Sequence, residues 1–244
     1  WHVAECNHTK SDEVILLSLI DNPSISKSGT MFLCNHRCFA DFYIDSAITN
    51  SSYLSRMMVM FGAPISCLFA WINDRILFIN RGKSNKKYIT SLVKSNYDNQ
   101  HKNILVYPES HRQQTNKSLE LKYGMIRQSY RNNIPIQIVI TTNKEKIWCL
   151  QTLEANSNVE CLIYVSNIIY PKDSNNIDEW CKLILNEWND LWKFAYSKNI
   201  EKTYIIPFKF KVDSSHKVNS LKLYFVLLCF FIFFLLIAKS IQTF

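Results

Sequence analysis

Short apolar runs alternate with longer amphipathic segments along most of this chain. Runs rich in β-branched and aromatic residues predict strands at 30–34, 75–81, 103–107, 134–141, 146–153 and 159–169. Apolar residues at helical spacing predict helices at 39–61, 84–98, 121–131 and 178–197. Residues 11–21 fit a short helix or a strand, and Gly62 and Pro64 break the apolar run 62–72. This alternation predicts an α/β fold, a layered domain with a mainly parallel central sheet flanked by helices.

The last apolar run differs from the others because it has no polar face. Leu223 to Ala238 carry no charge and would span about 24 Å as a helix, a little less than the ~30 Å of a bilayer core. A buried helix of a soluble domain normally keeps a polar stripe. We therefore predict a globular domain over 1–212, a linker over 213–220 and a single transmembrane helix over 221–241. More lysines precede this helix than follow it, which predicts a cytosolic globular part.

Length and cysteine content restrict the classes further. A chain of 244 residues can form one domain with a sizeable core, and because it opens on Trp1 we expect a segment upstream. The eight cysteines include no C-x-x-C pair, which is typical of reduced thiols in a cytosol-like compartment. Cys34, His36 and Cys38 lie close together, but from an extended strand they cannot all reach one tetrahedral ion. We expect no metal site.

The positive charge of the chain is concentrated in one region. The net charge is +8, and residues 81–131 contain eleven Lys/Arg against only Asp98, Glu109 and Glu120. The remaining acidic and basic residues cancel. This region suits an anionic partner such as a phosphate or an acidic membrane surface, although a solvated lysine-rich helix face would have the same composition.

Three polar clusters follow predicted strands, where α/β folds assemble their sites. NHRCFAD follows 30–34, NRGK follows RILFI, and PESHR follows 103–107. In the first cluster, His36 and Asp41 are five residues apart, which leaves their side chains about 140° apart on a helix. They can pair only if His36 stays in a loop and Asp41 begins the helix. From these residues alone, His36 is either a general base oriented by Asp41 or a structural histidine.

The order of the clusters carries more information than any one of them. N-H-x4-D, FINR, YPESHR, KYG and the strand IPIQIVIT follow one another over residues 30–142. This ordered set resembles the glycerolipid acyltransferases, which acylate glycerol phosphate and lysophospholipids. The resemblance implies that His36 is the general base and Asp41 its partner, and that an acceptor hydroxyl attacks acyl-CoA without a covalent enzyme intermediate. It also implies that acyl-CoA is a co-substrate and that no cofactor is needed. Acceptor-binding residues would be Asn80, Arg81, Glu109, Ser110 and Arg112.

The third cluster departs from the family pattern. Where the family has E-G-T-R, this chain has Ser110 and His111 in place of Gly and Thr. Losing the glycine removes a freely bent backbone position and reshapes the expected acceptor pocket, so this departure concerns the identity of the acceptor and not the chemistry. Glu109 is expected to hold Arg112 or to accept from a glycerol hydroxyl. Gln137, between apolar neighbours in the later strand, has no explanation from sequence.

The sequence thus predicts a membrane-bound, acyl-CoA-dependent O-acyltransferase of phospholipid biosynthesis on an endomembrane such as the endoplasmic reticulum. The expected acceptor is 1-acyl-sn-glycerol-3-phosphate (lysophosphatidic acid), and the expected partners are acyl-CoA, the lysophospholipid and the bilayer. Alternatives are another lysophospholipid acceptor (lysophosphatidylinositol or lysocardiolipin), a CoA-independent transacylase, and a non-catalytic lipid-binding protein. Residues 57–72 either dip into the bilayer or form a buried helix pair. A nucleotide-binding loop is excluded because Leu77 replaces its first glycine, and no nucleic-acid-binding module is present.

Overall fold

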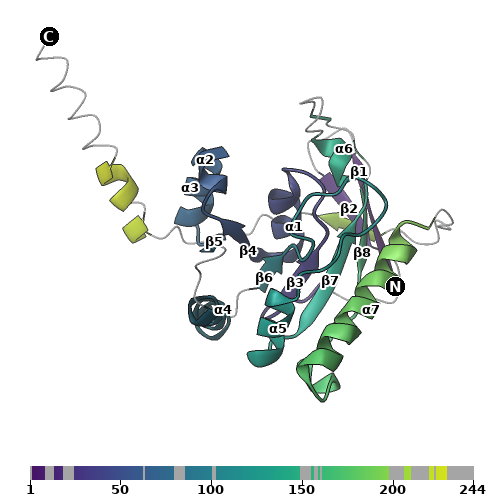
Figure 1. Ribbon diagram of the computed structural model, residues 1–244. Helices are drawn as coiled ribbons and strands as arrows, with labels where there is room; N and C mark the ends of the chain where they lie inside the picture. The colour runs from purple at the N-terminus through teal and green to yellow at the C-terminus, as the bar shows by residue number, and fades with distance from the viewer. Residues whose placement is uncertain are drawn as a thin grey trace, which may run out of the picture.

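The computed structural model describes most of the chain in one layered α/β arrangement (Figure 1). The described residues are 2–8, 14–18, 25–62, 64–79, 86–100, 103–148, 155–156, 159, 161–197, 206–209, 220–222 and 224–229. Within them, one sheet contains the strands β1 His2–His8, β2 Val14–Ser18, β3 Met31–Cys34, β4 Ser51–Arg56, β5 Ile76–Ile79, β6 Asn103–Val106, β7 Ile136–Thr141, β8 Cys161–Val165 and β9 Ile206–Lys209. The helices are α1 Asp41–Thr49, α2 Val59–Gly62, α3 Pro64–Ile72, α4 Lys86–Gln100, α5 Gly124–Arg131, α6 Lys144–Ile147 and α7 Ile177–Ala195, with a 3-10 turn at Pro171–Asp173.

The strand order β5-β4-β6-β3-β7-β8-β1-β2-β9 divides the sheet into two parts. From β5 to β7 all neighbours are parallel, with Met31 of β3 opposite Ile104 of β6 and Ile136 of β7. The strands from β8 onward pair antiparallel and extend one side of the sheet. The expected mainly parallel central sheet is therefore confirmed, and the carboxyl ends of β3, β4 and β6 meet at one edge.

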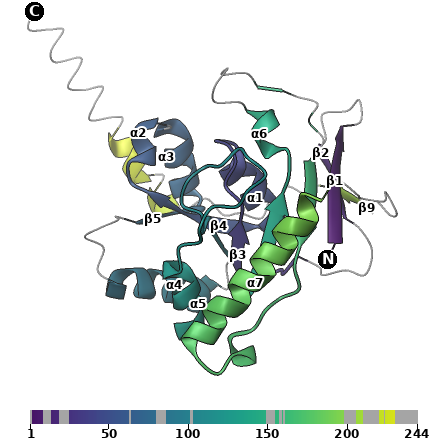
Figure 2. The same cartoon turned by 45° about the vertical axis from the view of Figure 1, so that its right-hand side comes forward.

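Both faces of the parallel part are covered, which explains why β3, β6 and β7 consist mostly of consecutive apolar residues. Met31 and Leu33 of β3 face a core that includes α4, α5 and α7, whereas Phe32 and Cys34 face a second core under α1 and α3. The two figures show α5 and α7 side by side on one face of the sheet (Figures 1 and 2). The predicted apolar face of the long helix is confirmed, since its three tryptophans, Ile184 and Leu191 are buried.

Most sequence-based elements are confirmed, and two are wrong in part. Residues 39–61 are not one helix, because Asn50 adopts a left-handed conformation (φ 48°) that ends α1 and lets Ser51–Arg56 pair as β4. The predicted strand at 146–153 instead begins with the end of α6, and Trp148 forms an isolated bridge with Ala155. The rest of that segment lies outside the described residues. In 11–21, the described part 14–18 is a strand.

The predicted transmembrane helix lies mostly outside the described residues. Residues 220–222 and 224–229 are helical, and the Lys222 ammonium donates to the Trp71 carbonyl at 3.0 Å and pairs with Asp74 at 2.5 Å. The beginning of this apolar helix is thus anchored beside α3 (Figure 2). Among the residues that the structure describes, no helix has both the length and the apolar character needed to cross a membrane. The predicted boundary between 1–212 and the linker also falls outside the described residues.

Candidate active site

His36 and Asp41 lie on either side of the turn from β3 into α1. β3 ends at Cys34, His36 lies in the following loop, and Asp41 is the first residue of α1. The Nδ1 atom of His36 is 2.8 Å from Asp41 Oδ2. The predicted geometry, with His36 in the loop and Asp41 in the first helical turn, is therefore confirmed.

The carboxylate of Asp41 is held by the loop around it. Its Oδ2 accepts hydrogen bonds from the backbone N–H groups of Arg37 and Cys38, the second at 2.9 Å. Its Oδ1 accepts from the Cys38 thiol at 3.1 Å. Burial alone would raise the pKa of Asp41, but the Lys144 ammonium and the bond to His36 outweigh it and lower this pKa to about 2. Asp41 is thus a fixed, ionised partner for the imidazole.

The imidazole of His36 is nearly buried but borders a cavity. The ring stacks on Tyr107 with centroids 4.4 Å apart, and the edge of Phe42 packs against it at 5.6 Å. Burial lowers the pKa of His36 below its usual 6.5, and it outweighs the opposing effect of Asp41. A neutral ring that donates Nδ1–H to Asp41 leaves Nε2 as the proton acceptor, which is the form that a general base requires.

A fully buried charge cluster lies behind this pair. The ammonium of Lys144, at the start of α6, pairs with Asp45 of α1 at 2.7 Å and lies 3.7 Å from Asp41. It also donates to the Asn35 carbonyl at 2.8 Å, and the Tyr107 hydroxyl donates to Asp45 at 2.9 Å. Burial raises the pKa of Asp45 to about 6 against the opposing effect of Lys144. The sequence reading missed Tyr107 and this cluster, although Asp45 lies one helical turn after Asp41.

Glu109 connects the loop after β6 to the loop that carries His36. Its two carboxylate oxygens accept from the backbone N–H groups of His36 at 3.1 Å and Leu119 at 2.9 Å. The Gln113 N–H donates to the His36 carbonyl at 2.9 Å, which adds a second link between the loops. Glu109 was expected to hold Arg112 or to contact the acceptor, but these hydrogen bonds give it a different role. Its carboxylate instead fixes the backbone of His36.

Ser110 adopts the backbone conformation that glycine would favour. Its φ is 64°, in the left-handed region that side chains other than Gly rarely occupy. This chain therefore forms a left-handed turn at the position where the family pattern has a glycine, at a cost of about 1–2 kcal/mol relative to an unstrained residue. His111 is exposed beside it.

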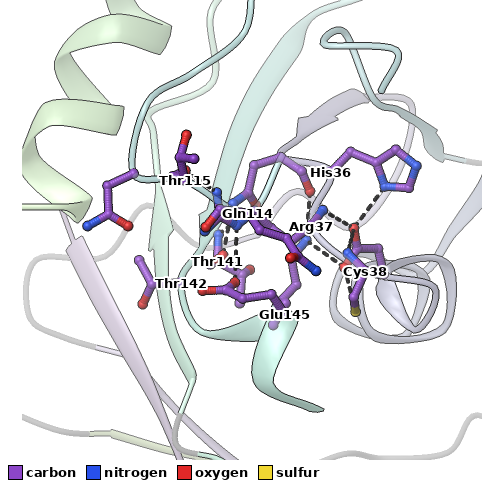
Figure 3. Close-up of polar contacts among 12 residues, drawn as sticks. His36, Arg37, Cys38, Gln114, Thr115, Thr141, Thr142 and Glu145 are labelled. Carbon is purple, nitrogen blue, oxygen red and sulfur yellow. Dashed lines mark hydrogen bonds and ion pairs between the residues drawn. The ribbon is translucent and has the colours of Figure 1, made fainter. Parts of the chain in front are cut away.

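Arg37 points away from the cavity and has a structural position. Its guanidinium is buried and donates to the carbonyls of Thr115 at 2.6 Å and Gln114 at 3.1 Å, and it pairs with Glu145 at 3.1 Å (Figure 3). Asn35 completes this framework, since its amide exchanges two 2.9 Å hydrogen bonds with the backbone of Thr141 at the end of β7. The residues on either side of His36 thus attach its loop to three other segments.

A cavity of about 550 Å³ opens beside His36. Its apolar lining includes Phe42, Val59, Ile89, Val106 and Met125. Among the described residues, its charged lining is entirely basic, and it consists of Arg56, Arg112, Lys122, Arg127 and Arg131. Ser110 and Tyr107 complete the end near the imidazole.

Arg112, in this lining, has a buried donor that no described residue accepts from. The guanidinium lies over the Phe39 ring at 3.6 Å, and its buried Nε has no hydrogen-bond partner among the described residues. Burial lowers the pKa of Arg112, which remains a cation. A buried donor without a partner is costly, so an anionic ligand in the cavity would stabilise it.

Three other sequence expectations have different outcomes. Asn80 and Arg81 lie outside the described residues. Among the residues that the structure describes, no group of three or more His, Cys, Asp or Glu could hold a metal ion.

Gln137, unexplained from sequence, is buried in β7 and joins two segments, because it accepts from the Ser26 N–H at 2.9 Å and donates to the Ser166 carbonyl at 3.0 Å.

The fold and this site define a class of protein: an α/β enzyme with a histidine–carboxylate pair at the edge of a parallel sheet. Comparison with known proteins gives the family. Residues 6–141, more than half of the chain, match the Acyltransferase family model, so the chain belongs to the Acyltransferase family. This confirms the resemblance seen in the sequence motifs.

A solved structure supports the fold. The 1-acyl-sn-glycerophosphate (LPA) acyltransferase PlsC from Thermotoga maritima superposes with a TM-score of 0.51 and 11% identity, over 72% of this chain and 70% of that chain. At that identity, the match shows a common fold. No curated protein matches the chain.

Proposed function

We propose that this protein transfers a fatty acyl group from acyl-CoA to the free hydroxyl of a lysophospholipid, with 1-acyl-sn-glycerol-3-phosphate as the preferred acceptor. The observation that carries the proposal is the 2.8 Å pair of His36 and Asp41 at a cavity whose charged lining is wholly basic. An apolar space with cationic side chains suits a lipid that carries a phosphate. The LPA acyltransferase activity in the name of PlsC agrees with this acceptor.

The reaction needs one base and no resident cofactor. Nε2 of His36 takes the proton of the acceptor hydroxyl as its oxygen attacks the thioester carbonyl. The carbon–sulfur bond then breaks, and the CoA thiolate leaves with the proton that His36 had taken. Asp41 holds the tautomer that makes Nε2 the acceptor and stabilises the transient imidazolium.

Arg112 is the residue best suited to the acceptor phosphate. It lines the cavity together with His36, and its buried Nε can donate to a phosphate oxygen. Asn80, Arg81 and Ser110 keep their proposed acceptor roles, with Ser110 at the end of the cavity near the imidazole. Glu109 contributes through the loop it holds.

The protein is proposed to work at a membrane, with its catalytic domain on the cytosolic side of the endoplasmic reticulum or a related endomembrane. The surface of α2 and α3 supports this, because Met58, Phe61, Ile65 and Phe69 are 70–83% exposed. No charged residue occurs from Met57 to Asn73. Exposed apolar patches of this kind mark contact with a membrane or a partner protein. Arg56 and Val59, next to this surface, line the cavity, which gives a lipid a short route to His36.

The test is thiol release from oleoyl-CoA by membranes that carry the protein, with a panel of lysophospholipid acceptors. Wild type is measured beside His36→Ala, and His111→Ala serves as a matched control on an exposed histidine. Release that depends on lysophosphatidic acid and is lost only in His36→Ala is the expected result. Dependence on lysophosphatidylinositol or lysocardiolipin would change the acceptor. Activity only with a phospholipid donor would indicate a transacylase, and equal release from all three proteins would leave a lipid-binding protein.

A further inference from the structure

Lys144 is an unusual residue in this fold because its ammonium is fully buried. Lysines are almost never fully buried unless they are paired, and an isolated ammonium costs several kcal/mol to remove from water. Asn143, with φ 63°, turns the chain after β7 and starts α6, which brings Lys144 under the loop of His36. The lysine thus comes from 99 residues beyond Asp45 to meet it at 2.7 Å.

The charges around His36 balance in a specific way. At neutral pH, above the raised pKa of Asp45, Asp41 and Asp45 supply two negative charges, Lys144 supplies one positive charge, and a neutral His36 adds none. One negative charge therefore remains, and it is compensated when His36 takes a proton. Without Lys144 two negative charges would face the imidazole, and without Asp45 none would remain in excess.

The other titratable groups around this cluster are mostly uncharged at neutral pH. Those that interact with Lys144 come from several elements: Cys34 at the end of β3, His36 and Cys38 in its loop, Asp41 and Asp45 in α1, Tyr107 and Glu109 after β6, and Tyr196 after α7. Burial raises the pKa of both cysteine thiols and both tyrosine hydroxyls, which keeps them neutral. Two further charged groups lie near His36 and carry opposite charges. Glu109 accepts from the backbone N–H of His36, and Arg112 has a positive charge that acts in the same direction as that of Lys144. Neither residue changes in the variants tested below.

We propose that Lys144 and Asp45 form a positioning pair that sets the net charge around His36 and Asp41, so that His36 stays neutral until it takes the proton of the acceptor. Lys144 is within 3.7 Å of Asp41 and opposes the attraction of that carboxylate for a protonated imidazole. Asp45 weakens this effect of Lys144, because its carboxylate lies 2.7 Å from the ammonium and offsets most of the positive charge. The proposal rests on the proposed role of His36 as base.

The test measures the pKa of His36 by NMR of labelled imidazole in the full-length protein, with its signal assigned by its loss in His36→Gln. Asp45→Asn keeps an oxygen for Lys144 and Tyr107 but leaves the lysine charge to Asp41 alone. We expect it to lower the pKa of His36 by about one unit, the lower end of the range for a nearby charge. Lys144→Met is expected to raise it, and Asp45→Asn/Lys144→Met together to restore the wild-type value.

The test can be decided even if one of the variants does not fold. Lys144→Met leaves two buried carboxylates and could fail to fold, but the double variant removes both charges and leaves neutral side chains of similar size. Asp45→Asn and the double variant are therefore sufficient. Lys146→Met and Asp190→Asn make the same charge changes at exposed positions and should leave the pKa of His36 unchanged. A wild-type pKa in Asp45→Asn, with only a lower melting temperature, would overturn the proposal.

A second readout separates this inference from the proposed function. If His36 is the base, kcat/KM rises with pH through its pKa, which lies below 6.5, and this acid limb should move down in Asp45→Asn and return in the double variant. If the His36 pKa values of the variants follow the expected order but the protein has no activity toward any acceptor, the proposed function is rejected and the charge balance stands. If activity depends on His36 but the pKa values do not follow that order, only the charge balance is rejected.

Discussion

The cluster behind His36 and the surface of α2 and α3 reverse the usual distribution of residues in opposite ways. Asp41, Asp45 and Lys144 are charged and fully buried, whereas Phe61 and Phe69 are large, apolar and more than 70% exposed. Buried charges are tolerated because each one meets an opposite charge or a backbone N–H. The exposed apolar side chains have no such compensation within the described residues. The charges of the first region are paired within the protein, although Asp45 Oδ1 has no hydrogen-bond partner among the described residues. The second region has the character of a surface that contacts a membrane or a partner protein.

The largest effect should come from breaking the buried region at Asp41. In Asp41→Asn the side chain loses its charge, and its amide cannot hold the imidazole tautomer that leaves Nε2 free. We expect kcat to fall about 1,000-fold or more. The measurement is thiol release with the preferred acceptor, and Asp190→Asn on the exposed side of α7 is the matched control. Activity within tenfold of wild type would mean that His36 does not depend on this carboxylate.

The exposed region is tested next, by replacing its two phenylalanines. Phe61→Ser/Phe69→Ser should weaken binding to liposomes about 100-fold, since each buried aromatic side chain contributes about 1.5–3 kcal/mol. The measurement is sedimentation with liposomes of a chain that ends at Ser220. Phe61 is a better choice than Trp71, because Trp71 is half-buried whereas Phe61 is exposed. Unchanged sedimentation would remove the membrane role of this surface.

Between the two regions lies the cavity, where Arg112 is expected to recognise the acceptor. Arg112→Ala should raise the KM for a phosphate-bearing acceptor about tenfold and leave kcat nearly unchanged, because a charged hydrogen bond in the ground state is lost. Steady-state kinetics with lysophosphatidic acid give both constants. A fall in kcat with a constant KM would place Arg112 in the transition state instead.

The smallest effect concerns the backbone at Ser110. Ser110→Gly should relieve the left-handed strain but lose chain entropy, for a net gain of about 0.5 kcal/mol in the free energy of unfolding. A thermal melt should show a rise of a few degrees at most. Ser110→Ala keeps the strain and should show no gain, so equal melting temperatures for the two variants would contradict this account.

The sequence revealed the elements that are buried by their own composition. The runs at 31–34 and 104–106 are apolar on both faces, and the run at 136–140 is so apart from Gln137, which is typical of strands covered on both faces. It did not reveal β4, because Ser51, Ser52 and Ser55 are poor strand formers that the neighbouring strands nevertheless bury. The pairing of His36 and Asp41 could be predicted because the two residues lie five positions apart, on either side of the start of α1.

The remainder of the site could not be found from local patterns. Lys144 meets Asp45 across 99 residues, and Glu109 meets the backbone of His36 across 73. A lysine in the polar segment TTNKEK resembles any surface lysine, and only the tertiary fold makes it a buried cation. Arg112 was predicted from its motif, but its unpaired Nε is visible only in the packed structure.

The position of Lys144 in the chain also bears on how the protein is made. His36 and Asp41 are synthesised early, yet β3 finds its two neighbours only when β6 and β7 have left the ribosome. The charge partner of the pair follows directly after β7. Long-range pairings of this kind form late in folding. A nascent or truncated chain therefore carries His36 and Asp41 without their neighbours. Under the proposed function, a chain interrupted before residue 144 should not deplete the acyl thioesters around it.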